Sequence, residues 1–356
     1  MNWSDQVVLL TGGTGSFGKK FTEILLREHA PKKLIVFSRD ELKQFEMRKQ
    51  FDGPQMRYFI GDVRDGDRLR RAMQGVDIVV HAAALKQVPA CEYNPIEAVK
   101  TNIEGARNII DAALDNDVKQ VLALSTDKAV NPVNLYGATK LVAEKLFVQA
   151  NSYRGTGPTG FSCVRYGNVV GSRGSVIPLF MEQRKSGTVT VTDERMTRFW
   201  LTLDQGVRFV INCIERMHGG EVFIPKIPST TIMDLVHAMA PDCDVNFVGI
   251  RPGEKLHEVL ISEDESRLAL DVGDMFVIQP AHPWWQADHW QGGKELPLDY
   301  RYASNTNDQW LNIDEIRSLV DNLEIAGATL RCCPMAASRS RMTMLKRWSL
   351  FYVPTG

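Results

Sequence analysis

Short runs of apolar, mostly β-branched residues alternate with amphipathic, helix-like stretches along the first half of the chain. Five of these runs predict strands, at residues 6–11, 33–37, 56–60, 76–81 and 118–125. The runs Val7-Val8-Leu9-Leu10 and Val121-Leu122-Ala123-Leu124 contain no polar alternation, so helices should cover both faces of the sheet. The pattern therefore predicts an α/β fold with a parallel, doubly wound sheet over residues 1–166.

Glycine and proline interrupt the pattern beyond residue 166, notably at 167–178, 225–229 and 251–253, with short helical stretches between them. We expect residues 167–325 to form mostly a smaller mixed α/β lobe, with some helices returning to the first domain. A cleft between the two parts is the expected ligand site.

Composition narrows the class of partner. The chain has 356 residues, 44% hydrophobic and 24% charged, with a formal charge of -1, so no basic excess favours nucleic acid or an anionic membrane. Its six cysteines form no CxxC pair, which predicts neither a metal site nor a disulfide framework and fits a reducing cytoplasm. No apolar run approaches the roughly 18 residues of a membrane span. A small-molecule partner is expected.

Glycines recur with GxxGxxG spacing at Gly12, Gly15 and Gly18, directly after the first predicted strand. Such glycines allow a tight turn, close approach of a pyrophosphate to the backbone, and packing of a helix on the strand. With Thr14, Ser16 and Phe17 they predict a dinucleotide site on a Rossmann-type sheet. A glycine-rich turn that binds nothing is the alternative.

Ser38 and Arg39 end the second predicted strand, where an NAD enzyme usually carries an acidic residue for the ribose 2′-hydroxyl. A hydroxyl and a guanidinium suit a 2′-phosphate, which favours NADP. In the alternative interpretation Arg39 is a surface cation, and in either case Asp40 is the expected N-cap of the next helix.

Tyr136 and Lys140 are four residues apart, and so lie on one face of a helix predicted over residues 135–151. A lysine beside a tyrosine favours the phenolate, a base that can take a hydroxyl proton while a hydride leaves the same carbon. Thr126, just past the fifth strand, can hydrogen-bond the same hydroxyl. A surface Tyr/Lys pair is the alternative.

In this order, the motifs resemble the extended short-chain dehydrogenase/reductase family of nucleotide-sugar epimerases and dehydratases. Within it, Ser125-Thr126-Asp127-Lys128-Ala129 is similar to the inverting UDP-N-acetylglucosamine 4,6-dehydratases. The resemblance implies that Asp127 is the acid for the departing 6-hydroxyl and Lys128 the base at C5. It also implies UDP-N-acetylglucosamine as substrate, NADP as a retained cofactor and a cytoplasmic homo-oligomer. A solvated charged turn is the alternative for Asp127 and Lys128.

The resemblance extends to further binding residues. It implies that Asp62 and Val63 contact adenine and that the segment after the fourth strand lies beside the nicotinamide ribose; this segment comprises Ala82, Ala83, Ala84 and Lys86. Lys86 is expected to reach substrate as well, unless it is a surface lysine. The other residues expected to meet the substrate are Asn168, Arg173, Arg198, Arg251 and Glu254.

Two other functions stay open: a UDP-sugar 4-epimerase or retaining dehydratase on the same fold, and a non-catalytic NADP-sensing regulator. The end of the chain is also open. Residues 326–356 carry arginine and lysine but no acidic residue, and no periodicity, which predicts a disordered tail. A frameshift into a downstream gene is the alternative.

Overall fold

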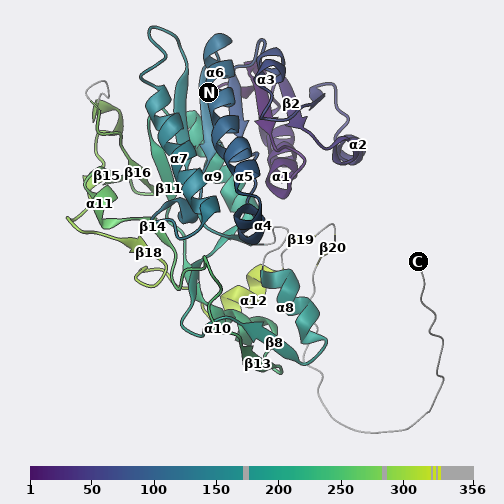
Figure 1. The fold of residues 1–356 in the computed structure, drawn as a ribbon, viewed down its shortest axis with the longest axis vertical. Helices are drawn as coiled ribbons and strands as arrows, with labels where there is room; N and C mark the ends of the chain where they lie inside the picture. The colour runs from purple at the N-terminus through teal and green to yellow at the C-terminus, as the bar shows by residue number, and fades with distance from the viewer. Residues whose placement is uncertain (171–175, 283–286, 322–323, 326–327, 330–356) are drawn as a thin grey trace, which may run out of the picture.

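A ten-stranded sheet forms the centre of the molecule (Figure 1). The computed structural model describes residues 1–170, 176–282, 287–321, 324–325 and 328–329. Along the sheet the strands are β17 (Lys294–Glu295), β15 (Ala269–Asp271), β16 (Met275–Ile278), β11 (Val222–Pro225), β6 (Gly160–Val164), β5 (Gln120–Leu124), β4 (Ile78–His81), β1 (Val7–Thr11), β2 (Lys33–Ser38) and β3 (Met56–Ile60).

The strands from β3 to β11 are parallel, in the spatial order β3-β2-β1-β4-β5-β6-β11. The first six have the doubly wound order 3-2-1-4-5-6, whose topological switch point lies between β1 and β4. This confirms the predicted fold class. The five predicted strands are present, each with ends within two residues of the prediction.

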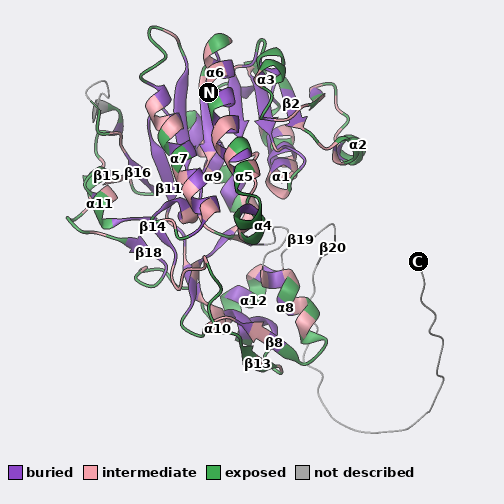
Figure 2. Ribbon diagram, viewed as in Figure 1, coloured by how far each residue is buried: buried purple, intermediate pink, exposed green. Residues whose placement is uncertain are grey.

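Every residue of β1, β4 and β6 is buried, because helices cover both faces of the sheet (Figure 2). In one group α1 (Ser16–Ile24) packs against α9 (Leu203–Arg216). In the other, α6 (Gly105–Asp115) packs against both α3 (Gly66–Ala72) and α7 (Leu135–Ala150). The remaining helices of this part are α2 (Glu41–Gln50), α4 (Val88–Tyr93) and α5 (Pro95–Val99), with the single turns η1 (Trp3–Asp5) and η4 (Asp127–Ala129) and the π-helical turns η2 (Leu25–His29) and η3 (Lys100–Glu104).

The sheet continues past residue 166. β11 joins β6 in parallel, while β16, β15 and β17 extend the same sheet in antiparallel pairs. The helix α9 also returns to the sheet, whereas the domain boundary at 166 stays a prediction. The four added strands are two to four residues long and separated by glycine and proline, so their sequence has too little periodicity to predict them.

A second hydrophobic core lies below the sheet in the view of Figure 1. It is built from α8 (Val176–Arg184), β8 (Thr188–Val191), α10 (Ile232–Met239), β13 (Asp244–Phe247) and α12 (Ile313–Asp321). Phe180, Val189, Leu235 and Ile316 are buried in it. Trp200 belongs to this core, while its neighbour Phe199 belongs to the core of the sheet, so the connecting segment joins the two parts.

Short strand pairs complete the structure: β7 (Val169–Val170) with β10 (Leu201–Thr202), β9 (Thr197–Phe199) with β12 (Ser229–Thr231), β14 (Val259–Ile261) with β18 (Tyr302–Ala303), and β19 (Glu324–Ile325) with β20 (Ala328–Thr329). Two further turns are α11 (Glu263–Ser266) and η5 (Ala287–Trp290). Of residues 326–356, which the sequence predicts to be a disordered tail, residues 328–329 form β20. The rest of this segment lies outside the described residues. No helix in the described ranges is both long and apolar enough to cross a membrane.

Candidate active site

A cavity of about 1130 Å³ runs from the turn after β1 to the small lobe. Its walls come from the carboxyl ends of the parallel strands, the first turns of α7, and the segments around Asn168, Arg198 and Glu254. This is the crevice in which doubly wound sheets bind their ligands. The cleft expected between the two parts of the chain is thus present.

The glycines of the turn after β1 allow close backbone packing around it. Gly12 has φ +65°, and a Cβ there would lie 2.9 Å from the backbone of Ala83. A Cβ at Gly18 would collide with the backbone of Gly13, so this glycine lets α1 pack on the turn. Gly15 is the N-cap of α1 and provides no side-chain cap, which leaves amide groups at the helix N-terminus available for an anion.

Ser38 and Arg39 lie at the end of β2, as predicted, and both line the cavity. The hydroxyls of Ser38 and Thr14 are 2.9 Å apart. Asp40 caps α2, confirming that prediction, because its carboxylate accepts a hydrogen bond from the amide of Lys43 at 2.9 Å. The Arg39 side chain is 58% exposed and lies 3.6 Å from the carboxylate of Asp62.

Asp62 already has a strong partner, since Arg64 donates to its carboxylate at 2.7 and 3.0 Å. Burial raises the pKa of Asp62, but the hydrogen bonds from Arg64 outweigh burial, and the net pKa is lowered. The carboxylate is therefore ionised and can accept one more donor, as an adenine contact requires.

Two residues that the sequence analysis missed fix the segment after β4. Thr11 Oγ1 lies 2.8 Å from Nδ1 of the buried His81, and it accepts hydrogen bonds from the amides of Ala82 and Ala83 at 3.2 and 3.3 Å. Burial, assisted by the charge of Lys140, lowers the pKa of His81 to about 3, so its imidazole is neutral. Thr11 and His81 are the last residues of β1 and β4 and stand opposite each other in the register of these neighbouring strands. Pairing the two predicted strands by their carboxyl ends could have revealed this contact.

Tyr136 and Lys140 lie on α7, near its start. The helix begins at Leu135 because Asn134 accepts a hydrogen bond from the amide of Gly137 at 2.8 Å. A Cβ at Gly137 would collide with the carbonyl of Lys128, so this glycine allows α7 to approach η4. The close approach brings Tyr136 into one cavity wall with Thr126 and Lys128.

The phenol of Tyr136 is buried, which raises its pKa to about 12 even though Lys128 and a hydrogen bond with Thr126 act in the opposite direction. Lys140 is also buried, and its ammonium donates to the carbonyl of Leu124 at 2.6 Å. Burial lowers the pKa of Lys140. Lys128 is thus a second cation that lowers the pKa of Tyr136, and the sequence analysis did not assign it to this task.

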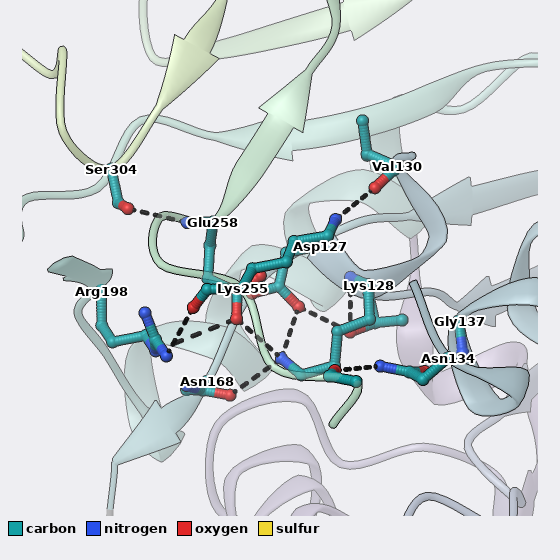
Figure 3. Close-up of polar contacts among 12 residues, drawn as sticks. Asp127, Lys128, Val130, Asn134, Gly137, Asn168, Arg198, Lys255, Glu258 and Ser304 are labelled. Atoms are coloured by element: carbon teal, nitrogen blue, oxygen red, sulfur yellow. Dashed lines mark hydrogen bonds and ion pairs between the residues drawn. The ribbon is translucent and has the colours of Figure 1, made fainter. Parts of the chain in front are cut away.

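Asp127 and Lys128 form the centre of a buried charge cluster (Figure 3). Asp127 is fully buried and accepts from the Thr126 hydroxyl at 2.8 Å and from Lys128 at 3.0 Å. Lys128 lines the cavity, whereas Asp127 is buried and is not among the lining residues. A solvated charged turn, the alternative interpretation of this pair, is inconsistent with this burial.

Most of the predicted site residues line this one cavity: Gly12, Gly15, Ser16, Phe17, Ser38, Arg39, Asp62, Val63, Ala82, Ala83, Ala84, Lys86, Thr126, Lys128, Tyr136, Lys140, Asn168, Arg198, Arg251 and Glu254. Thr14, Gly18 and Asp127 are buried and do not line it. Arg173 lies outside the described residues.

Comparison with known proteins shows the family. The model of the polysaccharide biosynthesis protein family matches residues 8–280, and the chain belongs to this family. The resemblance to sugar epimerases and dehydratases expected from the sequence is confirmed.

A protein of Campylobacter jejuni named UDP-N-acetylglucosamine 4,6-dehydratase (inverting) is 52% identical over 326 residues, covering 89% of this chain and 98% of that protein. The UDP-glucose 4-epimerase of Rickettsia conorii is 41% identical over 337 residues, covering 92% and 98%. The X-ray structure of Pen from Bacillus thuringiensis has a TM-score of 0.83 at 41% identity and covers 90% of this chain and 99% of that one.

Proposed function

We propose that the chain is an inverting UDP-N-acetylglucosamine 4,6-dehydratase that uses NADP. The observation that carries the proposal is the buried Asp127/Lys128 pair beside Thr126 and Tyr136, in a chain 52% identical to a relative of that name. Moving a hydride to and from C4 requires, besides a nicotinamide cofactor, only the tyrosine and its neighbours. Removing water from C5 and C6 requires additional acid and base groups, and this pair supplies them.

The residues of the glycine-rich turn fit a dinucleotide. Gly12, Gly15 and the capless start of α1 would hold its pyrophosphate, Asp62 its adenine, and Ser38 with Arg39 the 2′-phosphate of NADP. When bound, NADP would take the hydride from C4 of the sugar and later return one to C6. The rest of the chemistry belongs to the side chains.

Tyr136 would take the proton of the sugar 4-hydroxyl. Its buried phenol must become more acidic, and both Lys128 and Thr126 lower its pKa. Thr126 can also hydrogen-bond the same sugar oxygen. Lys140 holds the end of β5 through the carbonyl of Leu124, which positions the segment that carries Thr126.

The 4-ketone formed in this way acidifies the hydrogen at C5. By the resemblance, Lys128 then takes the C5 proton, and Asp127 provides a proton to the departing 6-hydroxyl. Return of a proton to C5 from the opposite face gives the L-configured 4-keto-6-deoxy sugar. The position of Lys128 in the cavity wall supports its direct contact with the sugar.

The substrate diphosphate would lie toward the small lobe. Arg198 is held there by three carbonyl groups, those of Thr197, Lys255 and Leu256. Arg251 and Glu254 line the same end of the cavity, and Asn168 and Lys86 lie nearer Lys128. The expected cytoplasmic location, homo-oligomer and absence of nucleic-acid partners also stay proposals.

Incubation of the protein with UDP-N-acetylglucosamine and NADP in D₂O, followed by NMR of the product, tests the function. We expect a 4-keto-6-deoxy sugar with inverted C5 that carries deuterium. A 4-epimer without loss of water would show an epimerase, the activity named in the Rickettsia relative. Retained C5 configuration would show a retaining dehydratase, and NADP binding without any product would favour the regulator.

A further inference from the structure

Glu258 is a carboxylate that the sequence motifs do not assign to the site. It immediately precedes β14, is 3% exposed, and its amide donates to the hydroxyl of Ser304 at 2.9 Å. Its Oε1 lies 3.4 Å from Nζ of Lys128, 130 residues away in the chain. Figure 3 shows the two side chains meeting beside Asp127.

The ammonium of Lys128 has three hydrogens, and three acceptors surround it. They are Asp127 Oδ1 at 3.0 Å, Asn168 Oδ1 at 3.2 Å and Glu258 Oε1 at 3.4 Å. A neutral amine has only two hydrogens and one lone pair, so it would leave one of these acceptors without a donor. The geometry therefore fits the charged form of Lys128.

The two carboxylates share this ammonium as an ion-pair partner. Asp127 Oδ2 and Glu258 Oε2 are both buried and have no hydrogen-bond partner among the described residues. The next cation of Glu258 is Arg198, whose Nε is 3.8 Å from Oε1. Burial in the protein makes the ammonium of Lys128 unfavourable, and two negative carboxylates beside it offset this desolvation cost. Removing either carboxylate would leave the ammonium less stable.

We propose that Glu258 is a positioning residue of the elimination step, which holds Lys128 in the cavity wall as an ammonium together with Asp127. The proposal rests on the proposed dehydratase function for its chemical consequence, but the contact itself does not depend on the substrate.

Other charged and titratable groups near Lys128 come from four segments. Tyr136 faces it from α7, Lys86 from the segment after β4, and Lys255 from the segment that carries Glu258. Lys255 donates to the carbonyl of Val130, and Arg198 is held by backbone carbonyls. Burial lowers the pKa of Lys128, but Asp127 and Glu258 outweigh burial, and the net pKa is raised.

The chemical consequence concerns the order of proton transfers. Lys128 can take the C5 proton only after giving one of its own to Asp127, which makes the amine neutral and the carboxyl protonated. The C5–H bond then breaks, its proton goes to Lys128, and its electron pair forms the C5–C6 double bond. The C6–O bond breaks as the oxygen takes the proton from Asp127 and leaves as water. Glu258 takes no part in these transfers and keeps Nζ of Lys128 in place through the contact at 3.4 Å.

The direct test is a pH titration of Lys128 by NMR in the full-length protein with ¹³Cε-labelled lysine, its resonance assigned with the Lys128→Arg variant. Glu258→Gln should lower the pH at which Lys128 loses its proton by about one to three units. Glu258→Asp, which keeps the charge, should remain near the wild type. Glu263→Gln, an exposed carboxylate on α11, is the matched control and should have no effect. An unchanged Lys128 titration in Glu258→Gln would overturn the proposal.

Kinetics give the second test. Since Glu258 is not part of the cavity wall, Glu258→Gln should leave KM for UDP-N-acetylglucosamine near the wild type. Because Lys128 acts as the C5 base only as a neutral amine, removing the charge that stabilises its ammonium should shift the pH dependence of kcat, and of C5 exchange with D₂O, to lower pH by about one to three units. The NADPH absorbance that reports C4 oxidation should persist. A pH dependence of kcat identical to that of the wild type would also overturn the proposal. A wild-type protein that forms no product would instead refute the proposed function and leave the titration result valid.

Discussion

Tyr136 shows how much a single side chain depends on its neighbours. Burial makes its phenol less acidic, with a pKa of about 12, whereas a base that acts at neutral pH needs the opposite. Lys128 and Thr126 supply part of the correction. The positive nicotinamide ring of a bound cofactor would contribute further, because opposite charge close to a phenolate stabilises it.

Tyr136→Phe should lower turnover by about 10² to 10⁴-fold, the usual contribution of a general base, because only the proton acceptor is removed. NADP and UDP should still bind, as measured by calorimetry. Tyr58→Phe is a suitable control, since Tyr58 lies on β3, is not part of the cavity wall, and its hydroxyl donates to the carbonyl of Phe51. Activity near the wild type in Tyr136→Phe would identify another group as the base.

Arg39 decides the choice between the two cofactors if the NADP proposal is right. Arg39→Ala should raise the Kd for NADP about tenfold or more and change that for NAD little, because a charge-assisted hydrogen bond to the 2′-phosphate contributes about 1.5 to 3 kcal/mol. Arg57→Ala, on β3 and bonded to the carbonyl of Pro54, is the control. Equal weakening of NADP and NAD would contradict the assignment.

The candidate site residues that could be predicted from the sequence are close to one another along the chain. Tyr136 and Lys140 share a helical face, and Asp127 and Lys128 are adjacent, so their spacing alone was enough to group them. Glu258 could not be found in this way, because 130 residues separate it from Lys128 and only the folding of β14 against η4 joins them. The burial of Asp127 was equally invisible in the sequence.

At the scale of elements, the contact between β1 and β4 holds the switch point together through Thr11 and His81. His81 is buried and its pKa is lowered to about 3, while in the unfolded chain it is near ~6.5. Between these two values the unfolded chain binds more protons. This histidine therefore contributes stability that is full above about pH 6.5 and is lost as the pH falls toward 3.

His81→Asn should reduce the pH dependence of stability. We expect the wild type to lose about 2 kcal/mol of unfolding free energy from this residue between pH 7 and pH 5, and the variant to lack that loss. Urea unfolding at the two pH values measures it. His237→Asn, an exposed position on α10, should show the wild-type dependence. A variant that retains the full pH dependence would show that another group titrates.

Continuous apolar strands and the helices between them were predictable because their periodicities differ and each element is long enough to show one. The antiparallel extension by β16, β15 and β17 was not. Each of these strands has four residues or fewer, and their pairing is determined by contact with β11, a property of the assembled sheet.

For the molecule as a whole, the cavity depends on how the segments after residue 166 pack against the sheet domain. Arg165, at the end of β6, holds two of these segments. It is fully buried and donates to Glu144 on α7 at 3.2 Å, to Glu265 on α11 at 2.8 Å and to the carbonyl of Leu260 on β14 at 2.8 Å. These bonds link the helix that carries Tyr136 to the strand that follows Glu258.

Arg165→Met should destabilise the protein by about 3 to 5 kcal/mol, because it leaves the buried carboxylate of Glu144 without a counterion. Glu265 is less affected, since its side chain is 21% exposed and can be rehydrated. The double variant Arg165→Met with Glu144→Gln should therefore recover part of the loss, as measured by urea unfolding in a double-mutant cycle. Arg267→Met, which removes the exposed pair with Asp264, should change stability by less than about 1 kcal/mol. If the double variant were no more stable than Arg165→Met, the loss would come from packing around the guanidinium, and Arg165 would hold α7, α11 and β14 together through shape instead of charge.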